Sequence, residues 1–258
     1  MLHRKLTRGL LVLLSAAAGT ASAELPVTFD ASGSYRYAQS FDTLGTTSRA
    51  FEWYDNRTLP GWHLLNFVEQ PLVTPTYRGD TGDDGGGSFY SYGLEGDGNR
   101  ALGALGSGGS YFGTPAAGRL AGYITVAFRN TGTTDIRRVD VRFDGQQWRQ
   151  GASDNLNTMV FEYGVGEEFG HVAWIRPGRG FDFDSPSPLI GSAEGQVVFG
   201  RDRLARQALG GSLAPLWPAG AKLWMRWAFL NNHGFDHGLA IDDFRLSVAA
   251  RLGLPDES

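Results

Sequence analysis

Hydrophobic and polar residues alternate with a period of two along much of this chain, which is the pattern of strands that bury one face. In segment 223–229 apolar residues occupy the odd positions, and Arg226 lies on the opposite side. Helical periodicity is nearly absent, so the pattern predicts half-buried antiparallel strands. The clearest strands are expected at 123–129, 139–144, 159–165 and 223–229.

Turn residues such as Asn, Gly and Pro separate these segments, and one short helix is expected at 201–209. Weaker strands are expected at 40–44, 61–68, 89–94, 100–105 and 197–200. No fixed-period repeat or long linker divides the chain. The sequence therefore predicts an all-β fold, a single antiparallel β-sandwich of the jelly-roll or concanavalin-like type, over residues 24–258.

Residues 1–23 are typical of a cleaved signal peptide, because a basic start is followed by a short apolar run and the small residues Ala21-Ser22-Ala23. No later segment is apolar for long enough to form a transmembrane anchor. The formal net charge is -4, which argues against a nucleic-acid partner, and the chain has no cysteine. We expect an exported protein, periplasmic or extracellular.

The stretch 234–246 holds two adjacent carboxylates, Asp242 and Asp243, where the apolar positions change from odd to even. A strand cannot change parity without an irregularity, so one extra residue, a β-bulge, is expected there. Two neighbouring carboxylates also suggest a structural Ca²⁺ site, which needs further oxygens. Asp42 is the expected third ligand, since first and last strands of jelly rolls often pair. The alternative is that these carboxylates bond to backbone N–H groups or to arginine.

A second candidate site surrounds Trp148, which lies between Gln147 and Arg149. A flat apolar ring beside amide and guanidinium groups suits a carbohydrate edge or a protein partner. The alternative is that Trp148 packs in the core or at a strand edge.

Other charged segments carry weaker signals. The acidic loop 80–87 departs from the calcium-binding EF-hand pattern and is expected to be solvated. His233, Asp236 and His237 have a spacing that could bind a transition metal, but a turn capped by polar side chains fits them better. Glu162, Glu167 and Glu168 are the acids available for glycoside hydrolysis, although their spacing matches no established pattern.

Five segments of the chain match those of known proteins, namely 41–45, 59–62, 100–108, 147–149 and 236–244. In these segments the chain resembles a family of exported bacterial β-sandwich modules often found in proteins with a PEP-CTERM sorting tail. The closing Ala-Ile-Asp-Asp-Phe is also similar to the end of MAM-type jelly rolls. The resemblance implies a secreted or surface-associated sandwich and supplies no catalytic residues. Unlike many such proteins, the chain ends without a membrane segment and basic tail, so release is expected.

These observations favour a non-enzymatic exported module that binds an extracellular glycan or a cell-surface partner. Asp42, Asp242 and Asp243 would hold the cation, and Gln147, Trp148 and Arg149 would contact the ligand. The alternative is a polysaccharide-degrading enzyme, a glycoside hydrolase or lyase, on a concanavalin-like sandwich.

Overall fold

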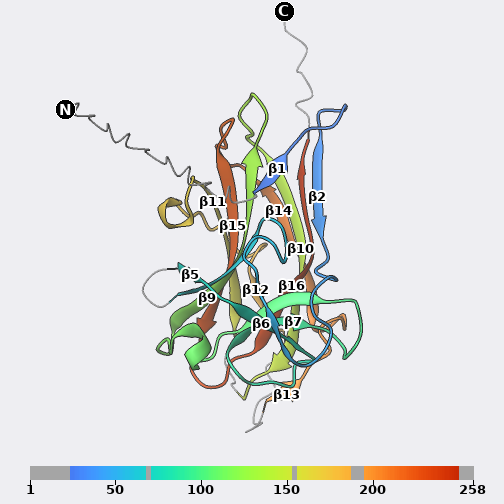
Figure 1. The fold of residues 1–258 in the computed structure, drawn as a ribbon, viewed down its shortest axis with the longest axis vertical. Helices are drawn as coiled ribbons and strands as arrows, with labels where there is room; N and C mark the ends of the chain where they lie inside the picture. The colour runs from blue at the N-terminus through green and yellow to red at the C-terminus, as the bar shows by residue number, and fades with distance from the viewer. Residues whose placement is uncertain (1–23, 68–70, 153–155, 187–194, 250–258) are drawn as a thin grey trace, which may run out of the picture.

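The computed structural model describes residues 24–67, 71–152, 156–186 and 195–249. The predicted signal peptide, residues 1–23, lies outside this range. The described residues form sixteen strands and two short 3-10 helices, η1 (Ser110–Phe112) and η2 (Phe169–His171). The strands make two facing sheets, so the predicted all-β, jelly-roll-like sandwich is confirmed (Figure 1).

One sheet has seven strands in the order β12-β11-β15-β9-β4-β5, and β1 adds to β9. All its pairings are antiparallel except that of β1 with β9. The long strands β11 and β15 run on the left in Figure 1. The bounds are β1 (Leu25–Val27), β4 (Trp62–Phe67), β5 (Pro71–Val73), β9 (Arg119–Asn130), β11 (Thr158–Val165), β12 (Phe183–Asp184) and β15 (Lys222–Asn231).

The other sheet has nine strands in the order β13-β10-β16-β8-β7-β6-β3. In addition, β14 pairs with β10 and β2 pairs with β16. The long strands β10 and β16 run on the right in Figure 1, beside β2. The bounds are β2 (Tyr35–Gln39), β3 (Ala50–Glu52), β6 (Thr76–Asp80), β7 (Ser88–Tyr92), β8 (Ala101–Leu105), β10 (Val139–Gln150), β13 (Gln196–Val197), β14 (Arg206–Leu213) and β16 (Gly238–Val248).

The core between the sheets is centred on aromatic rings, and Trp227 of β15 contacts rings from both sheets. Its ring stacks on Trp62 with centroids 5.8 Å apart. It also meets Phe143 and Phe244 of the nine-stranded sheet edge to face, at 5.4 and 5.5 Å. Large buried rings contribute most of the apolar area removed from water, so this cluster joins the two sheets.

The predicted β-bulge is present in β16. Arg142 of β10 lies opposite Arg245, whereas Asp144 lies opposite Asp242, so β16 contains one extra residue. Asp243 has a φ of 48°, in the left-handed region. Before the bulge Ile241 faces the core, and after it Phe244 does. The extra residue therefore changes the parity of the strand, as the hydrophobic pattern requires.

The expected helix at 201–209 is wrong. Residues 201–205 form turns, and β14 begins at Arg206. The segment pairs with β10 from Gln146↔Arg206 onward, so sheet hydrogen bonds outweigh a short local match to helical spacing. Within the described part of the chain, no helix is long and apolar enough to cross a membrane.

The left-handed conformation of Asp243 gives a test of the bulge. Asp243→Val should lower the free energy of unfolding by about 1–2 kcal/mol, because a β-branched residue is strained at positive φ. Asp243→Gly should be tolerated. Arg245→Val, at an exposed position of the same strand, is the matched control and should change stability little. Urea unfolding of the three variants measures the difference, and equal effects of the two valines would contradict the assignment.

Candidate functional site

The three predicted calcium ligands lie near the bulge, but each has its own hydrogen-bond or ionic partner. Asp42 accepts a hydrogen bond from the backbone N–H of Arg100 at 2.9 Å. Asp242 accepts one from the backbone N–H of Asp243 at 2.7 Å. The exposed carboxylate of Asp243 lies 3.8 Å from the guanidinium of Arg245. Across the described ranges, no group of three or more His, Cys, Asp or Glu is placed to hold a metal ion. The backbone and arginine alternative therefore describes these contacts.

Asp242 is a buried carboxyl group on the outer side of the nine-stranded sheet. Its second oxygen accepts a hydrogen bond from the Gln146 side-chain amide at 3.0 Å. Burial raises the pKa of Asp242 to about 7, and repulsion from Asp243 and Asp42 adds to the effect, while the hydrogen bonds lower it. The carboxylates are thus close enough to interact, and their mutual repulsion is part of the site.

Trp148 points away from the main core but is only 1% exposed. It belongs to a separate cluster with Tyr90 and Tyr92, and it stacks on Tyr92 at a centroid distance of 6.1 Å. Its Nε1 donates to Gln146 at 2.8 Å, and the backbone around Gly200 covers the ring so closely that an added Cβ would lie 2.3 Å from Nε1. The contact patch expected around Trp148 is therefore not an exposed surface in this structure.

The neighbours of Trp148 are engaged as well. Gln147 is fully buried and lies 3.3 Å from Nδ1 of His237. Arg149 donates to the backbone carbonyls of Gly82 and Asp83 at 3.0 and 2.8 Å. It thereby fastens the acidic loop 80–87, in which Asp80 is buried rather than solvated. These side chains stabilise loops in the described conformation.

The loop before β16 has the capped turn that its sequence favours. The Asp236 carboxylate accepts hydrogen bonds from the backbone and the side chain of Asn232 at 2.8 and 2.9 Å. Burial raises the pKa of Asp236 to about 6, against the effect of these bonds. Among the described residues, His233, Asp236 and His237 do not form a group that could hold a transition metal.

A different group of side chains gathers on the outer face of the seven-stranded sheet. Glu162 of β11 is the register partner of Arg226 on β15. Arg226 is the partner of Thr125 on β9, which also pairs with His63 on β4. The residues that flank these four along their strands are core residues, so the four side chains point outward. We call Glu162, Arg226, Thr125 and His63 the polar row.

The two ends of the polar row are ion-paired or hydrogen-bonded. Nη2 and Nε of Arg226 lie 2.6 and 2.7 Å from the same carboxylate oxygen of Glu162. Nδ1 of His63 lies 2.9 and 3.0 Å from the carboxylate oxygens of Asp55, which orients the ring. Thr125 is fully buried, and its hydroxyl has no hydrogen-bond partner among the described residues. An Asp–His pair can act as a base in covalent catalysis, but no hydrogen bond from a nucleophile to His63 is found among the described residues.

Aromatic rings surround Arg226 in this row. Its guanidinium carbon lies 4.3 Å from the ring centroid of Tyr123 and 3.8 Å from that of Trp174. The ring of Phe169 packs on the same side of the sheet, and its centroid lies 5.5 Å from that of Tyr123 and 5.7 Å from that of Trp224. We call Tyr123, Trp224, Phe169 and Trp174 the aromatic group. Rings that alternate with charged hydrogen-bonding groups can hold an amphipathic ligand such as a sugar.

Two members of the aromatic group come from a loop that lies on this face. Residues 166–174, which we call the cover loop, follow β11 and contain η2, the coil at the upper left of Figure 1. Val172 and the ring of Trp224 join one apolar cluster with Trp174 and Phe169 packed against it. As a result Tyr123 and Trp224 are only 8% and 7% exposed.

The glutamates considered for hydrolysis all have a basic side chain as a partner. Glu162 is paired with Arg226, and Glu167 lies 3.0 Å from Arg129. Glu168 lies 3.3 Å from Nδ1 of His171 in the exposed part of the cover loop. Glu162 and Glu167 are thus ion-paired with arginine, and Glu168 lies beside an imidazole nitrogen.

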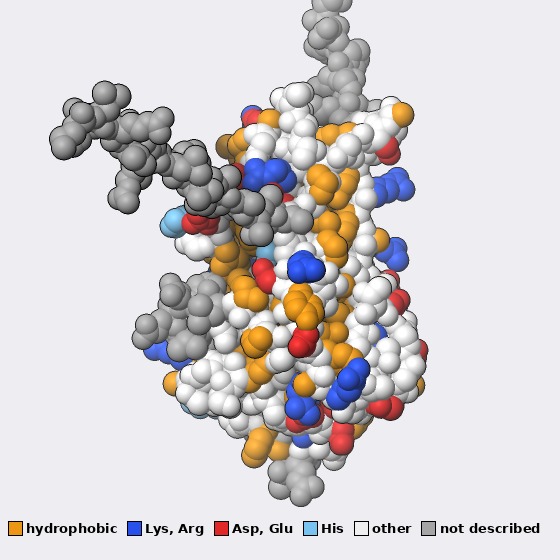
Figure 2. Space-filling model, in the orientation of Figure 1, with side chains coloured by type: hydrophobic (Ala, Val, Ile, Leu, Met, Phe, Trp, Pro, Cys, Tyr) orange, Lys and Arg blue, Asp and Glu red, His pale blue; other side chains and the backbone are white. Residues whose placement is uncertain are grey.

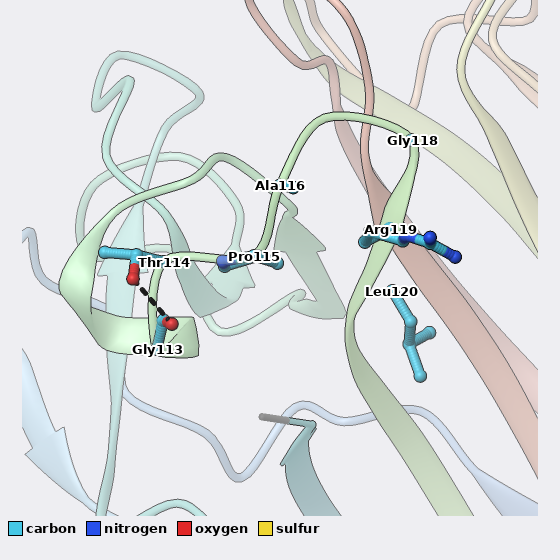
Figure 3. Close-up of a pocket in the computed structure, with 7 residues that line it drawn as sticks. All are labelled: Gly113, Thr114, Pro115, Ala116, Gly118, Arg119 and Leu120. Atoms are coloured by element: carbon cyan, nitrogen blue, oxygen red, sulfur yellow. Dashed lines mark hydrogen bonds between the residues drawn. The ribbon is translucent and has the colours of Figure 1, made fainter. Parts of the chain in front are cut away.

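A hollow of about 510 Å³ lies beside the same face (Figure 3). It is lined by residues 113–116 and 118–120, and Leu120 packs against Leu65, Tyr123 and Ala228. The Asn231 side chain holds the loop by donating to the carbonyl of Pro115 at 2.6 Å. The hollow therefore borders the outer face of the seven-stranded sheet.

The sequence gives only part of this site. It places Arg226 opposite the core residues of its strand and provides Glu162 as a surface acid, while His63 looks isolated. The register that aligns β11, β15, β9 and β4 joins strands that are far apart in the chain, and the pattern within one strand does not specify it. A comparison of the outward positions of neighbouring strands is the signal that could have found the polar row.

No protein-family model and no curated protein matches the chain. Solved structures that are similar to it share little sequence. The CBM22-1 xylan-binding domain of Xyn10C from Paenibacillus barcinonensis is 10% identical, with 83% of this chain and 93% of that one covered and a TM-score of 0.35. The K3 adhesin domain of Lys-gingipain from Porphyromonas gingivalis is 12% identical, with 77% and 98% covered and a TM-score of 0.37.

The Stig cyclase Fisc from Fischerella is 11% identical, with 83% and 100% covered and a TM-score of 0.37. These TM-scores are low, and the proteins have different functions. One fold can carry unrelated activities, so the function has to be argued from the site itself.

The raised pKa of Asp242 predicts how stability changes with pH. The folded protein keeps a proton on Asp242 up to a pH of about 7, whereas an unfolded aspartate loses it near the ordinary value of 3.8. Stability should therefore fall as the pH rises from about 4 to about 7, and Asp236 should add to the fall. Asp242→Asn should flatten this part of the curve in thermal unfolding. Asp243→Asn removes only one of the repulsive charges and should flatten the curve less than Asp242→Asn does. An unchanged slope in Asp242→Asn would refute the assignment.

The unpaired hydroxyl of Thr125 predicts a stabilising substitution. Thr125→Val keeps the shape of the side chain and removes a buried group without a partner, so the free energy of unfolding should rise by about 1 kcal/mol. Thr158→Val is the control, because Thr158 donates a hydrogen bond to Asp184 at 2.5 Å. That variant should gain nothing. Denaturant unfolding compares the two, and a loss of stability in Thr125→Val would show that the hydroxyl is satisfied.

Proposed function

We propose that the protein is an exported, non-enzymatic module that binds an extracellular glycan on the outer face of its seven-stranded sheet. The observation that carries the proposal is the placement of Arg226 between aromatic rings, with Glu162 and His63 in the same row. Aromatic rings stack on the C–H faces of sugars, and the charged groups between them can bond to hydroxyls. The resemblance to exported bacterial sandwich modules and the predicted signal peptide support the export part of the proposal.

The charge on this face favours a neutral glycan. Arg226 is neutralised by Glu162, and Lys222 lies 2.7 Å from Glu24. Arg129 meets Glu24 at 2.6 Å and Glu167 at 3.0 Å. On the side of the molecule seen in Figure 2, where the seven-stranded sheet lies to the left, basic and acidic side chains are also interspersed rather than gathered by sign. A strongly anionic polysaccharide would have to displace these carboxylates, whereas neutral hydroxyl groups can bond beside them.

The calcium site remains a hypothesis from the sequence, and it belongs to the same proposal as a structural element. It requires the melting temperature at neutral pH to rise when millimolar Ca²⁺ replaces EDTA, because a ligand of the native state alone adds RT ln(1 + [L]/Kd). The rise should be lost in Asp242→Asn. An unchanged melting temperature in the wild type would remove the cation from the proposal.

A glycan array with the wild-type protein, followed by calorimetry with the polysaccharide that binds, tests the main proposal. Tyr123→Ala should weaken binding by about tenfold or more, equivalent to about 1.4 kcal/mol. Tyr123→Phe keeps the ring and should bind like the wild type. Tyr54→Ala is the matched control, since Tyr54 is an aromatic residue 55% exposed in the turn after β3.

Three results would contradict the proposal. The first is an array without any binding, and the second is equal binding by Tyr123→Ala and Tyr54→Ala. The third is release of reducing ends or unsaturated products from the bound polysaccharide, which would favour the degrading enzyme instead.

A further inference from the structure

We propose that the cover loop occupies the ligand subsite in the free protein, and that the sugar ring takes the place of the Trp174 side chain on Arg226. This inference rests on the proposed glycan-binding function and identifies its subsite. The ring of Trp174 lies 3.8 Å from the Arg226 guanidinium, with Tyr123 on the same group at 4.3 Å. A flat sugar face placed there would make the same contacts that the loop now makes.

The cover loop is fastened at its two ends. At its start, the indole N–H of Trp224 donates to the Gly166 carbonyl at 3.0 Å. Just after its end, Ile175 and Tyr163 exchange backbone hydrogen bonds of 2.8 and 3.0 Å. Between these points the backbone bonds that the structure describes join the loop to itself, as in His171 N–H to the Glu168 carbonyl at 3.0 Å. The middle of the loop is held on the sheet mainly by its apolar side chains and by the Glu167 ion pair, and it can lift without breaking the sheet.

The polar row, whose Arg226 lies under rings of the loop, contains a hydroxyl that no described residue bonds. The Thr125 hydroxyl is buried next to Arg226 and His63 in the sheet register and has no partner among the described residues. An unpaired buried hydroxyl costs free energy, so the closed state pays a penalty that a ligand hydroxyl could remove. The side chains beneath the loop are therefore suited to a polyhydroxylated ligand.

The substitution Gly164→Ala would push the cover loop away from the sheet by adding one methyl group beneath it. A Cβ at this position would lie 2.5 Å from the carbonyl oxygen of Ala173 and 2.5 Å from Val172. Both contacts are in the cover loop, and the first is with backbone, so the loop must move. Gly170, in the middle of the same loop, has nothing within 4 Å of an added Cβ. The two Gly→Ala variants thus form a matched pair.

The experiment measures glycan binding by Gly164→Ala, Gly170→Ala and the wild type, using the neutral polysaccharide found on the array. If the open form is about 10% of the free protein, Gly164→Ala should bind up to about tenfold more tightly, because the apparent Kd is the intrinsic Kd divided by the open fraction. Gly170→Ala should match the wild type. Amide hydrogen exchange at 168–174 should be faster in Gly164→Ala alone.

Phe169→Ala gives a second route to the open form, since it removes a ring that holds the loop on Tyr123 and Trp224 without changing β11. It should also bind more tightly than the wild type. If both variants are folded and neither binds more tightly, the inference is wrong, while weakened binding by Tyr123→Ala keeps the glycan function. If neither the wild type nor the opened variants bind any glycan, the function itself fails.

Discussion

The β-bulge at Asp242–Asp243 is the constraint on which the arrangement of the nine-stranded sheet depends. β16 lies beside β10 along its length, but its other neighbour changes at the bulge, from β8 before it to β2 after it. Both halves of β16 must present apolar side chains to the same core, and a regular strand would turn one half outward. The extra residue lets Ile241 and Phe244 both face Trp227 and its neighbours.

The same alternation that fills the core creates two outer faces, and a loop covers part of each. On the nine-stranded sheet the segment around Phe199 and Gly200 covers Trp148. On the seven-stranded sheet the cover loop lies over Arg226 and Tyr123. Each face buries aromatic rings that the main core does not use, so the exposure of these rings is decided by the loops and not by the strands.

Sequence patterns predicted the long strands and the bulge because both follow from the period-two geometry of neighbouring residues. The weaker strand expected at 40–44 is wrong, since β2 ends at Gln39 and a turn follows it. They failed where contacts come from distant segments. Trp148 was expected at a ligand surface, yet its burial depends on residues 198–205, which pair with β10 through Val198 and Ala205. The outward side of the strand containing Arg226 was predicted correctly, but its alignment with Thr125 and His63 depends on the pairing of strands far apart in the chain.

The two covered faces differ in how their loops are held, and this difference separates a structural cover from an exchangeable one. Over Trp148, Val198 donates to the Trp148 carbonyl at 2.9 Å, the indole N–H is bonded to Gln146, and Gly200 leaves no room for a side chain. Lifting that cover would break sheet-like backbone bonds. On the seven-stranded sheet the Thr125 hydroxyl has no partner among the described residues, and ring contacts of Phe169 and Trp174 hold the cover loop. A ligand ring can replace the rings of the cover loop without leaving buried polar groups unpaired. The outer face of the seven-stranded sheet is therefore the one suited to a ligand.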